Sequence, residues 1–381
     1  MPRTTLVPIT PAVLSWAIDE SGYTRPEISE RLKVDMADLV SWERGRAMPR
    51  LKDFRSLARI LRRQAAVFLL PERPQDSLPP VEMRGPPGQL RSSLNPEERK
   101  FVRQISRIQH TLAWIARESG VLGESQFPTF SRSDDAENTA SRIRAALGIG
   151  VASQTKWTNA SVAFRAWREA IERHGVLSFL LPLGAKSARG LCLWDLHAPA
   201  LIINSAWNVE ARIFTMFHEV GHVVTRTNSA CIGYVGIGSE SDRNVERWCD
   251  RFAASLLMPA DAVKDILKRD FRWDGQSIQD LELPSRLARR LKVSLRASVL
   301  RLVDLRMADR SLYGQIPQAS DNKAKGRGGK GRSRAEARED QFGSRVRGTF
   351  ARAVNEELMT RADALTFLDI GDEDFAIEAA G

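Results

Sequence analysis

The sequence predicts a mainly helical α+β protein, with an N-terminal bundle of short helices followed by a larger domain that contains a small sheet. Two observations support this prediction. Apolar residues recur at helical spacing along much of the chain, and three short runs near its middle have the pattern of strands. A proline-rich segment separates residues 1–70 from the rest, and 381 residues suffice for two or three domains.

Composition and charge narrow the class of protein. The chain is 43% hydrophobic and carries 9 tryptophans, so it can form packed cores, and its net charge of +10 favours an anionic partner. Its 3 cysteines, Cys192, Cys231 and Cys249, have no paired spacing, which is typical of a reducing compartment. The N-terminus lacks a signal-peptide pattern, and the longest apolar run, 176–183, is too short to span a bilayer. We therefore expect a cytoplasmic protein with no membrane partner.

The N-terminal bundle, residues 1–70, should contain four helices. We expect them at 11–21, 26–32, 35–44 and from 51 to about 70, with Gly22 and Gly45 ending the first and third. Residues 71–94 then form a proline-rich linker, because 6 prolines lie between 71 and 88.

The rest of the chain divides by the same signals. Residues 95–158 should form a helical connector that begins at the Asn95 cap. The main domain, 159–312, should contain strands at 176–181, 191–196 and 200–203, followed by a helix that contains His218 and another at 242–257. Residues 313–341 are polar and basic and are expected to be disordered, whereas 342–381 should form a small helical tail.

The most informative motif is His218-Glu219-Val220-Gly221-His222. On a helix that Asn208 can cap, residues four apart lie on one face, so the two imidazoles can bind one metal ion. The carboxylate of Glu219 can then reach a metal-bound water. Gly221 lowers helix stability, which indicates close packing of another backbone on that side. The motif predicts a zinc hydrolase, although these ligand types also suit Mn²⁺.

A catalytic zinc ion usually has three protein ligands, so a third must come from elsewhere. The best candidate is Glu246, at the border of the apolar face of the helix expected at 242–257. Asp250, one turn further, is either an alternative ligand or an acceptor that orients a liganding histidine. Cys249 is expected to be a small core residue. The other histidines, His110, His174 and His197, have no ligand spacing.

Two segments and several upstream residues form a family pattern. They are His218-Glu219-x-x-His222 and Glu246-x-x-Cys249-Asp250-x-Phe252-Ala253-Ala254-x-Leu256-Leu257-Met258-Pro259, with Trp167, Gly175, Arg189-Gly190, Pro199 and Asn204 upstream. This pattern resembles the ImmA/IrrE family of metallopeptidases over about 159–305, although this chain has Cys249-Asp250 where the family usually has Ala-Asn. The resemblance implies a zincin-like, gluzincin-type domain in which Glu246 is the third zinc ligand.

The residue types suggest a mechanism for peptide hydrolysis. The ion would activate a water molecule, and Glu219 would take its proton and later deliver it to the leaving amine. Tyr234 is a candidate donor to the oxyanion. A substrate would bind in extended form along an exposed strand, for which 191–196 is our candidate edge.

The N-terminal bundle contains the pattern Thr24-x-x-x-Ile28-Ser29-x-x-Leu32, Val34, then Trp42-Glu43-x-Gly45-x-x-x-Pro49. This pattern resembles the Xre/Cro class of helix-turn-helix domains. The run Arg44, Arg46, Arg50 and Lys52 contains no acid and could bind DNA phosphates. The third helix opens with Asp35-Met36-Ala37-Asp38, which is poor in side chains that read bases. A protein-binding use of the same fold therefore stays open.

These observations favour a zinc-dependent endopeptidase fused to a helix-turn-helix domain. By resemblance, its substrate would be a helix-turn-helix repressor, cleaved to derepress stress or mobile-element genes. One alternative is a DNA-binding regulator whose peptidase-like domain is a sensor or dimerisation module. Another is an antitoxin-like partner in a two-gene module.

Overall fold

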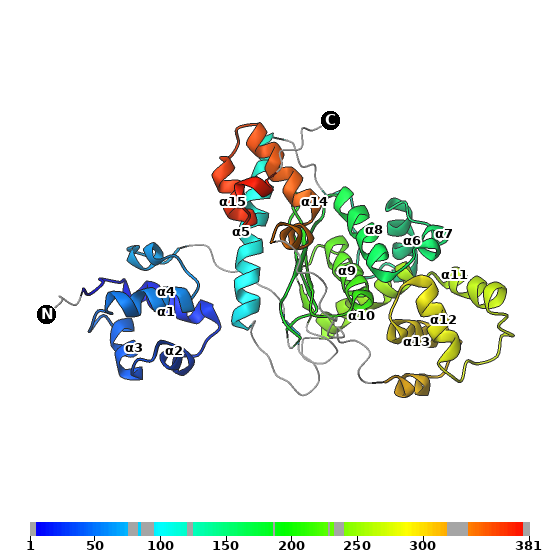
Figure 1. The fold of residues 1–381 in the computed structure, drawn as a ribbon. Coiled ribbons are helices and arrows are strands. Elements are labelled where there is room, and N and C mark those ends of the chain that lie inside the picture. Colours follow the sequence, from blue (N-terminus) through cyan, green and yellow to red (C-terminus); the bar gives the residue numbers. More distant parts are fainter. Residues whose placement is uncertain are drawn as a thin grey trace. The chain divides into compact units, whose positions relative to one another are not determined.

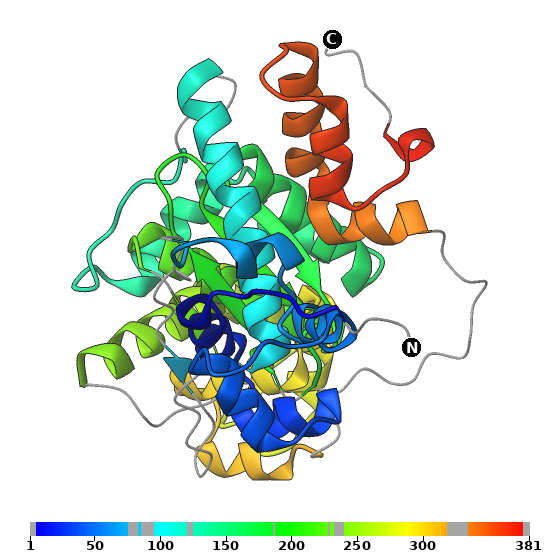
Figure 2. The ribbon, with the colours of Figure 1, turned by 90° about the vertical axis from the view of Figure 1, so that its left-hand side faces the viewer.

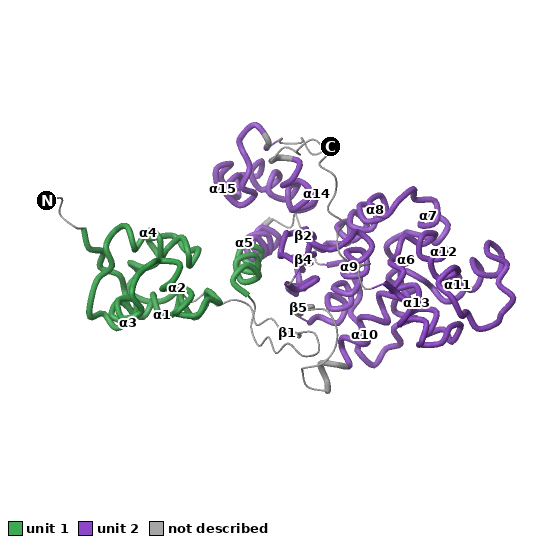
Figure 3. The backbone as a smooth tube through the Cα atoms, turned by 60° about the horizontal axis from the view of Figure 1, so that its bottom comes forward, with its two compact units in different colours: residues 1–80, 91–106 green, residues 81–90, 107–381 purple. Residues whose placement is uncertain are grey.

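The structure of this chain, a computed structural model, describes residues 5–74, 83–84, 95–119, 125–185, 187–227, 229–231, 240–317 and 334–375. The chain divides into two compact units, which Figure 3 distinguishes by colour. Unit 1 comprises residues 1–80 and 91–106, and unit 2 comprises 81–90 and 107–381. Each unit is described by itself.

In residues 96–106, unit 1 contains the first part of a longer helix. The described residues of unit 1 before 75 form four short α-helices, labelled in Figure 1 and seen from another side in Figure 2. They are α1 (Pro11–Ser21), α2 (Arg25–Leu32), α3 (Met36–Glu43) and α4 (Leu51–Ile60). Gly22 ends α1 in the left-handed conformation, at φ 79°, as its position in the sequence predicted. A small apolar core holds the helices together, and its members include Leu14, Ile28, Leu39, Trp42 and Leu57.

The prediction that the fourth helix extends to about residue 70 is wrong. In the structure α4 ends at Ile60, and Arg62 adopts a left-handed φ of 52°. Residues Ala65–Leu69 form a separate 3₁₀ turn, η1. The turn buries Phe68 against Phe54, with ring centroids 6.0 Å apart and nearly perpendicular planes. The packing of Phe68 onto the bundle therefore accounts for the end of α4 at Ile60, where the sequence has no glycine or proline to end a helix.

Helix α5 (Pro96–Ser119) begins where the sequence predicted. Asn95 accepts the amide of Glu98 at 2.8 Å, and the Glu98 carboxylate accepts the amide of Asn95 at 2.7 Å, which makes a reciprocal cap. Within unit 2, Gln109 of this helix donates to the carbonyls of Leu193 and Ala198 at 2.7 and 3.0 Å. These bonds attach the second part of α5 to the sheet.

Unit 2 contains a five-stranded sheet with the order β1-β5-β3-β4-β2. The three predicted strands are present as β2 (Leu177–Leu181), β3 (Gly190–Leu193) and β4 (Ala200–Asn204). Two short strands, β1 (Met83–Arg84) and β5 (Ser229–Cys231), extend the sheet. β3 is antiparallel to both β4 and β5, whereas the pairs β2–β4 and β1–β5 are parallel.

The prediction that 191–196 is an exposed edge is wrong. β3 lies between β4 and β5, and it ends at Leu193. Asp195 then accepts the amides of His197 and Ala198, each at 2.9 Å, and turns the chain toward β4. The edge was misassigned because β5 and β1 come from distant segments, and the pattern within one strand does not show its partners. For the same reason, Met83–Arg84 was expected in the linker.

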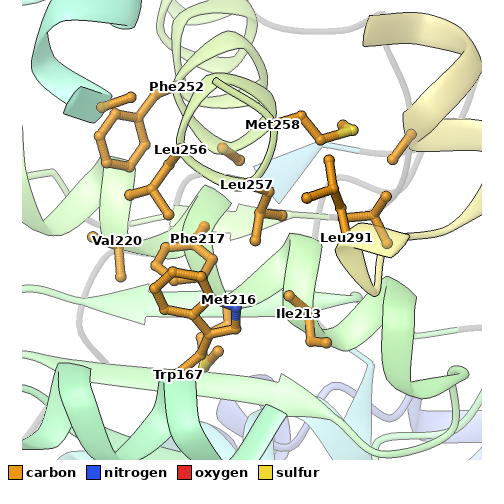
Figure 4. Packing of buried hydrophobic residues seen from close by; sticks show 14 of the residues in the cluster. Trp167, Ile213, Met216, Phe217, Val220, Phe252, Leu256, Leu257, Met258 and Leu291 are labelled. Atoms are coloured by element: carbon orange, nitrogen blue, oxygen red, sulfur yellow. The ribbon is translucent and has the colours of Figure 1, made fainter. Parts of the chain in front are cut away.

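The helices of unit 2 enclose one large core against the sheet. Helix α9 lies at its centre, and Figure 4 shows Phe217 and Val220 from α9 packed with Trp167 and Phe252. The Trp167 and Phe217 rings meet edge to face, with centroids 4.9 Å apart. The helical elements of unit 2 after α5 are α6 (Ala136–Ala146), α7 (Val151–Lys156), α8 (Ala160–Arg173), α9 (Val209–Val224), α10 (Glu240–Leu257), α11 (Ala260–Asp265), the π-turn η2 (Ile266–Asp270), α12 (Glu282–Leu291), α13 (Leu295–Asp304), η3 (Arg310–Gln315), α14 (Arg334–Asn355), α15 (Arg361–Leu368) and η4 (Asp372–Asp374).

The C-terminal tail is an integral part of unit 2. Helix α14 begins at Arg334, earlier than the expected start at 342, so the expected disordered segment 313–341 contains helix at its end and η3 at its start. Residues 318–333 lie outside the described part. α14 packs against the edge strand β2, and Arg168 of α8 donates to the carbonyl of Asp340 at 2.6 Å. None of the described helices has the length and apolar character needed to cross a membrane.

Candidate metal centre

Helix α9 places both histidines of the motif on one face. The side chain of Asn208 caps the helix by accepting the amide of Ala211 at 2.8 Å, as predicted. His218 and His222 are 6% and 2% exposed, and their Nε2 atoms lie 3.4 Å apart. Two lone-pair-bearing nitrogens can therefore point to one position within the protein.

Helix α10 brings the predicted third ligand to the same place. The Oε2 atom of Glu246 lies 3.0 Å from Nε2 of His218, and its Oε1 atom lies 3.3 Å from Nε2 of His222. Burial by itself would raise the pKa of Glu246, but the hydrogen bonds and charges of both histidines hold it well below its usual range. The carboxylate is therefore an anion that faces both imidazoles.

Asp250 lies on the other side of the His218 ring. Its Oδ1 atom is 2.9 Å from Nδ1, whereas Glu246 contacts Nε2. Burial alone would lower the pKa of His218, but the hydrogen bonds to Asp250 and Glu246 raise it well above its usual value. Of the two roles that the sequence left open for Asp250, this position fits the acceptor that orients a liganding histidine.

Cys249 is a second geometric candidate for the third ligand. One ligand atom each from His218, His222 and Cys249 lie within 4.8 Å of one another. Burial raises the pKa of the Cys249 thiol, and the nearby carboxylates of Glu246 and Asp250 raise it further, so the thiolate that a metal needs is disfavoured. We therefore favour Glu246, which contacts both Nε2 atoms.

The sulfur of Cys249 instead fills the space above Gly221. A Cβ atom at position 221 would lie 2.9 Å from Sγ of Cys249 and 3.3 Å from its Cα. The close approach of another backbone, which Gly221 predicted, is confirmed. It lets α10 lie near enough to α9 for Glu246 to reach the histidines.

Glu219 is fully buried and extends toward strand β3. A Cβ atom on Gly190 would lie 2.7 Å from Oε1 of Glu219 and 2.5 Å from Cγ2 of Thr215. Only glycine leaves room for this carboxylate, because real Cβ atoms do not approach so closely. Gly190 was not predicted to belong to the site, although a glycine at the start of an apolar strand is a signal of close approach.

Thr227 is a second residue of the site that was not predicted from the sequence. Its Oγ1 atom lies 2.9 Å from Nδ1 of His222, just beyond the end of α9. No motif signals it, because its position depends on how the chain leaves the helix. Tyr234, the candidate oxyanion donor, lies outside the described residues.

The remaining candidates lie apart from this cluster of side chains. His174 hydrogen-bonds the carbonyl of Ala170 at 2.8 Å and stacks on Phe127, which fits the structural role expected of it. In unit 1, the four basic residues singled out for phosphate binding are all exposed, and in the described part of the chain none of them forms an ion pair. They are Arg44, Arg46, Arg50 and Lys52.

The donor set fits a divalent ion such as Zn²⁺. Two imidazole Nε2 atoms and an ionised carboxylate converge, and each imidazole has an oxygen partner at Nδ1. This pattern of ligands on one side and ring-orienting acceptors on the other is typical of zinc sites. The fold and the site thus define a candidate metal centre on a buried His-Glu-x-x-His helix beside a sheet.

Comparison with known proteins also indicates a metallopeptidase domain. Residues 171–303 match the family model of the IrrE N-terminal-like domain, Peptidase_M78. The radiation response metalloprotease IrrE of Deinococcus deserti is 28% identical over 133 residues, which are 34% of this chain and 43% of that protein. The protein of the same name from Deinococcus radiodurans is 27% identical over 133 residues, or 34% of this chain and 37% of that protein.

The matches cover less than half the length of these curated relatives. The family-model match, 171–303, includes all the residues of the candidate metal centre, and together the matches support a metallopeptidase domain of the ImmA/IrrE type in this chain. The N-terminal helices lie outside the matched residues.

Proposed function

We propose that this chain is a zinc-dependent endopeptidase in which His218, His222 and Glu246 bind the metal and Glu219 is the catalytic base. The observation that carries the proposal is the convergence of both Nε2 atoms and the Glu246 carboxylate within 3.4 Å of one another. The similarity to the IrrE N-terminal-like domain supports it.

A bound zinc ion would act as a Lewis acid on the peptide carbonyl and on the attacking water. Glu219, adjacent to His218 on α9, takes a proton from this water as its oxygen bonds to the carbonyl carbon. The same carboxylic acid then gives the proton to the amine nitrogen as the C–N bond breaks. Its burial beside Gly190 excludes bulk water from the carboxylate, so few competing proton donors reach it.

The proposed substrate is a transcriptional regulator of the helix-turn-helix type, cleaved in the cytoplasm to derepress stress or mobile-element genes. This choice rests on the ImmA/IrrE resemblance and on the two relatives, both named radiation response metalloproteases. A substrate strand that pairs with β3 on the side away from β4 would have to take the place of β5.

Glu219→Gln tests the catalytic proposal. Gln has nearly the same shape but no basic carboxylate, so we expect the protein to fold and to lose cleavage. New protein N-termini would be compared in cells that carry the wild type or the variant, and the peptides missing from the variant identify the substrate. Glu210→Gln, at the start of α9, makes the same change outside the centre and should retain all cleavages. An unchanged set of N-termini in Glu219→Gln would exclude peptidase activity.

We also propose that the four helices of unit 1 form a helix-turn-helix domain that contacts DNA phosphates. The exposed positions of Arg44, Arg46, Arg50 and Lys52, and their lack of ion-pair partners within the described part, support this proposal. This second candidate function is independent of catalysis, and it would survive in a regulator whose peptidase domain is only a sensor.

Arg44→Gln/Arg46→Gln tests the DNA proposal. If both guanidinium groups contact phosphates, the slope of log affinity against log salt should become less steep by about 2. Arg165→Gln/Arg173→Gln on α8, two exposed arginines of unit 2, removes the same charge and should leave the slope unchanged. Equal slopes for the wild type and the unit 1 variant, measured by fluorescence anisotropy, would count against DNA contact by this surface.

A further inference from the structure

The C-terminal end of α9 places two threonine hydroxyls beside the candidate metal centre. Thr225 is the C-cap, and the following residue, Arg226, adopts a left-handed φ of 55°. The amide of Thr227 then donates back to the carbonyl of His222 at 2.9 Å. This reversal of the chain, and not the helix itself, brings Oγ1 of Thr227 within 2.9 Å of Nδ1 of His222.

The hydrogen-bond donors in this cluster can be assigned in sequence. The hydroxyl of Thr225 donates to the carbonyl of Gly221 at 2.9 Å, so its oxygen is free to accept. It lies 3.2 Å from Oγ1 of Thr227, whose proton can therefore point to Thr225. A second acceptor for that proton, the carbonyl of His222, lies at 3.5 Å.

This arrangement bears on the hydrogen bond to the imidazole. With the Thr227 proton directed to Thr225, the oxygen of Thr227 accepts from Nδ1–H of His222. A neutral imidazole with its proton on Nδ1 has its lone pair on Nε2. That nitrogen faces Nε2 of His218 and the carboxylate of Glu246, at 3.4 and 3.3 Å.

We propose that Thr227 is a positioning residue for His222, and that the Thr227–Thr225 hydroxyl pair keeps the His222 proton on Nδ1 so that Nε2 can bind the metal. The inference rests on the proposed metal centre. In this arrangement the two liganding histidines are held differently, His218 by the carboxylate of Asp250 and His222 by hydroxyls that end on a backbone carbonyl.

The test is the zinc affinity of the full chain, measured by competition with a chelator. Thr227→Val keeps the shape and removes the hydroxyl, and we expect it to weaken zinc binding by about 10- to 100-fold. Thr227→Ser keeps the hydroxyl and should restore the affinity of the wild type. Thr349→Val removes a buried hydroxyl of α14, outside the metal centre, and should have no effect.

The ¹⁵N chemical shifts of the His222 ring in zinc-loaded protein supply a second readout that a merely structural role would not change. Nδ1 should have the shift of a protonated nitrogen in the wild type and in Thr227→Ser, and an altered shift or faster proton exchange in Thr227→Val. Thr227→Ala repeats the measurement without a branched side chain, should the valine variant not fold. Zinc affinity and ring shifts equal to those of the wild type in both hydroxyl-free variants would overturn the inference. If the hydroxyl-free variants bind zinc more weakly but the wild type cleaves no protein, the result would support the positioning role of Thr227 and count against the proposed peptidase.

Discussion

Glu246→Ala is expected to weaken zinc binding by a factor of about 10² to 10³ and so to abolish metal-dependent activity at submicromolar zinc. Zinc sites with four protein ligands contribute roughly 10 to 16 kcal/mol in all, so one ligand accounts for about 3 kcal/mol. The loss should be large here because the Glu246 carboxylate contacts Nε2 of both histidines, at 3.0 and 3.3 Å. Competition with a chelator would measure it.

Cys249→Ala is the matched variant, because it removes the other geometric candidate for the third ligand from the same helix. We expect zinc affinity to stay that of the wild type, and the free energy of unfolding to fall because the sulfur that packs on Gly221 is lost. The reverse outcome, a large loss of affinity in Cys249→Ala with little change in Glu246→Ala, would assign the third ligand to the thiolate.

Arg168→Leu is expected to lower the free energy of unfolding of unit 2 by about 3 to 5 kcal/mol, because it leaves a buried carboxylate without its main partner. The side chains of Arg168 and Glu172 are only 10% and 4% exposed, and Nε of Arg168 lies 3.0 Å from Oε1 of Glu172. The guanidinium also donates to the carbonyls of Ser178 in β2 and Asp340 in α14, so it connects three elements. Urea denaturation followed by tryptophan fluorescence would measure the change.

The double variant Arg168→Leu/Glu172→Leu is the control for this interpretation. It removes both charges, so we expect it to be more stable than Arg168→Leu alone. The hydroxyl of Ser344 also donates to the Glu172 carboxylate at 2.8 Å, so the double variant loses this bond as well. A double variant as unstable as the sum of the two single variants would show that the ion pair itself contributes little.

Local signals in the sequence predicted most of the helices and the three main strands. Pro11 and Gly22 bound α1, Asn95 with Pro96 starts α5, and Asn208 caps α9, each as expected from short-range chemistry. These predictions succeed because a cap or a left-handed glycine acts within a few residues of chain. The end of the fourth helix failed because the packing of Phe68, a tertiary contact, overrides local propensity.

The candidate metal centre was predictable in its residue types and only partly in its geometry. Helical spacing placed His218 and His222 on one face, and the resemblance to a family selected Glu246, which the structure brings within 3.3 Å of both. Their role as ligands stays a prediction. The side of His218 on which Asp250 lies follows from the packing of α10 on α9, and that packing depends on the absence of a side chain at Gly221.

The α+β class, the positions of most elements and the His-Glu-x-x-His helix could be predicted from the sequence alone. These features depend on periodicity, caps and motif spacing, all of which are local, whereas Glu246 was selected by the resemblance to a family. Three further features required the tertiary structure: β5 lies between β3 and β1, α14 packs on β2, and Gly190 and Thr227 approach Glu219 and His222. Such contacts join residues far apart in the chain or beyond a helix end, and they depend on shape and close packing that no local pattern encodes.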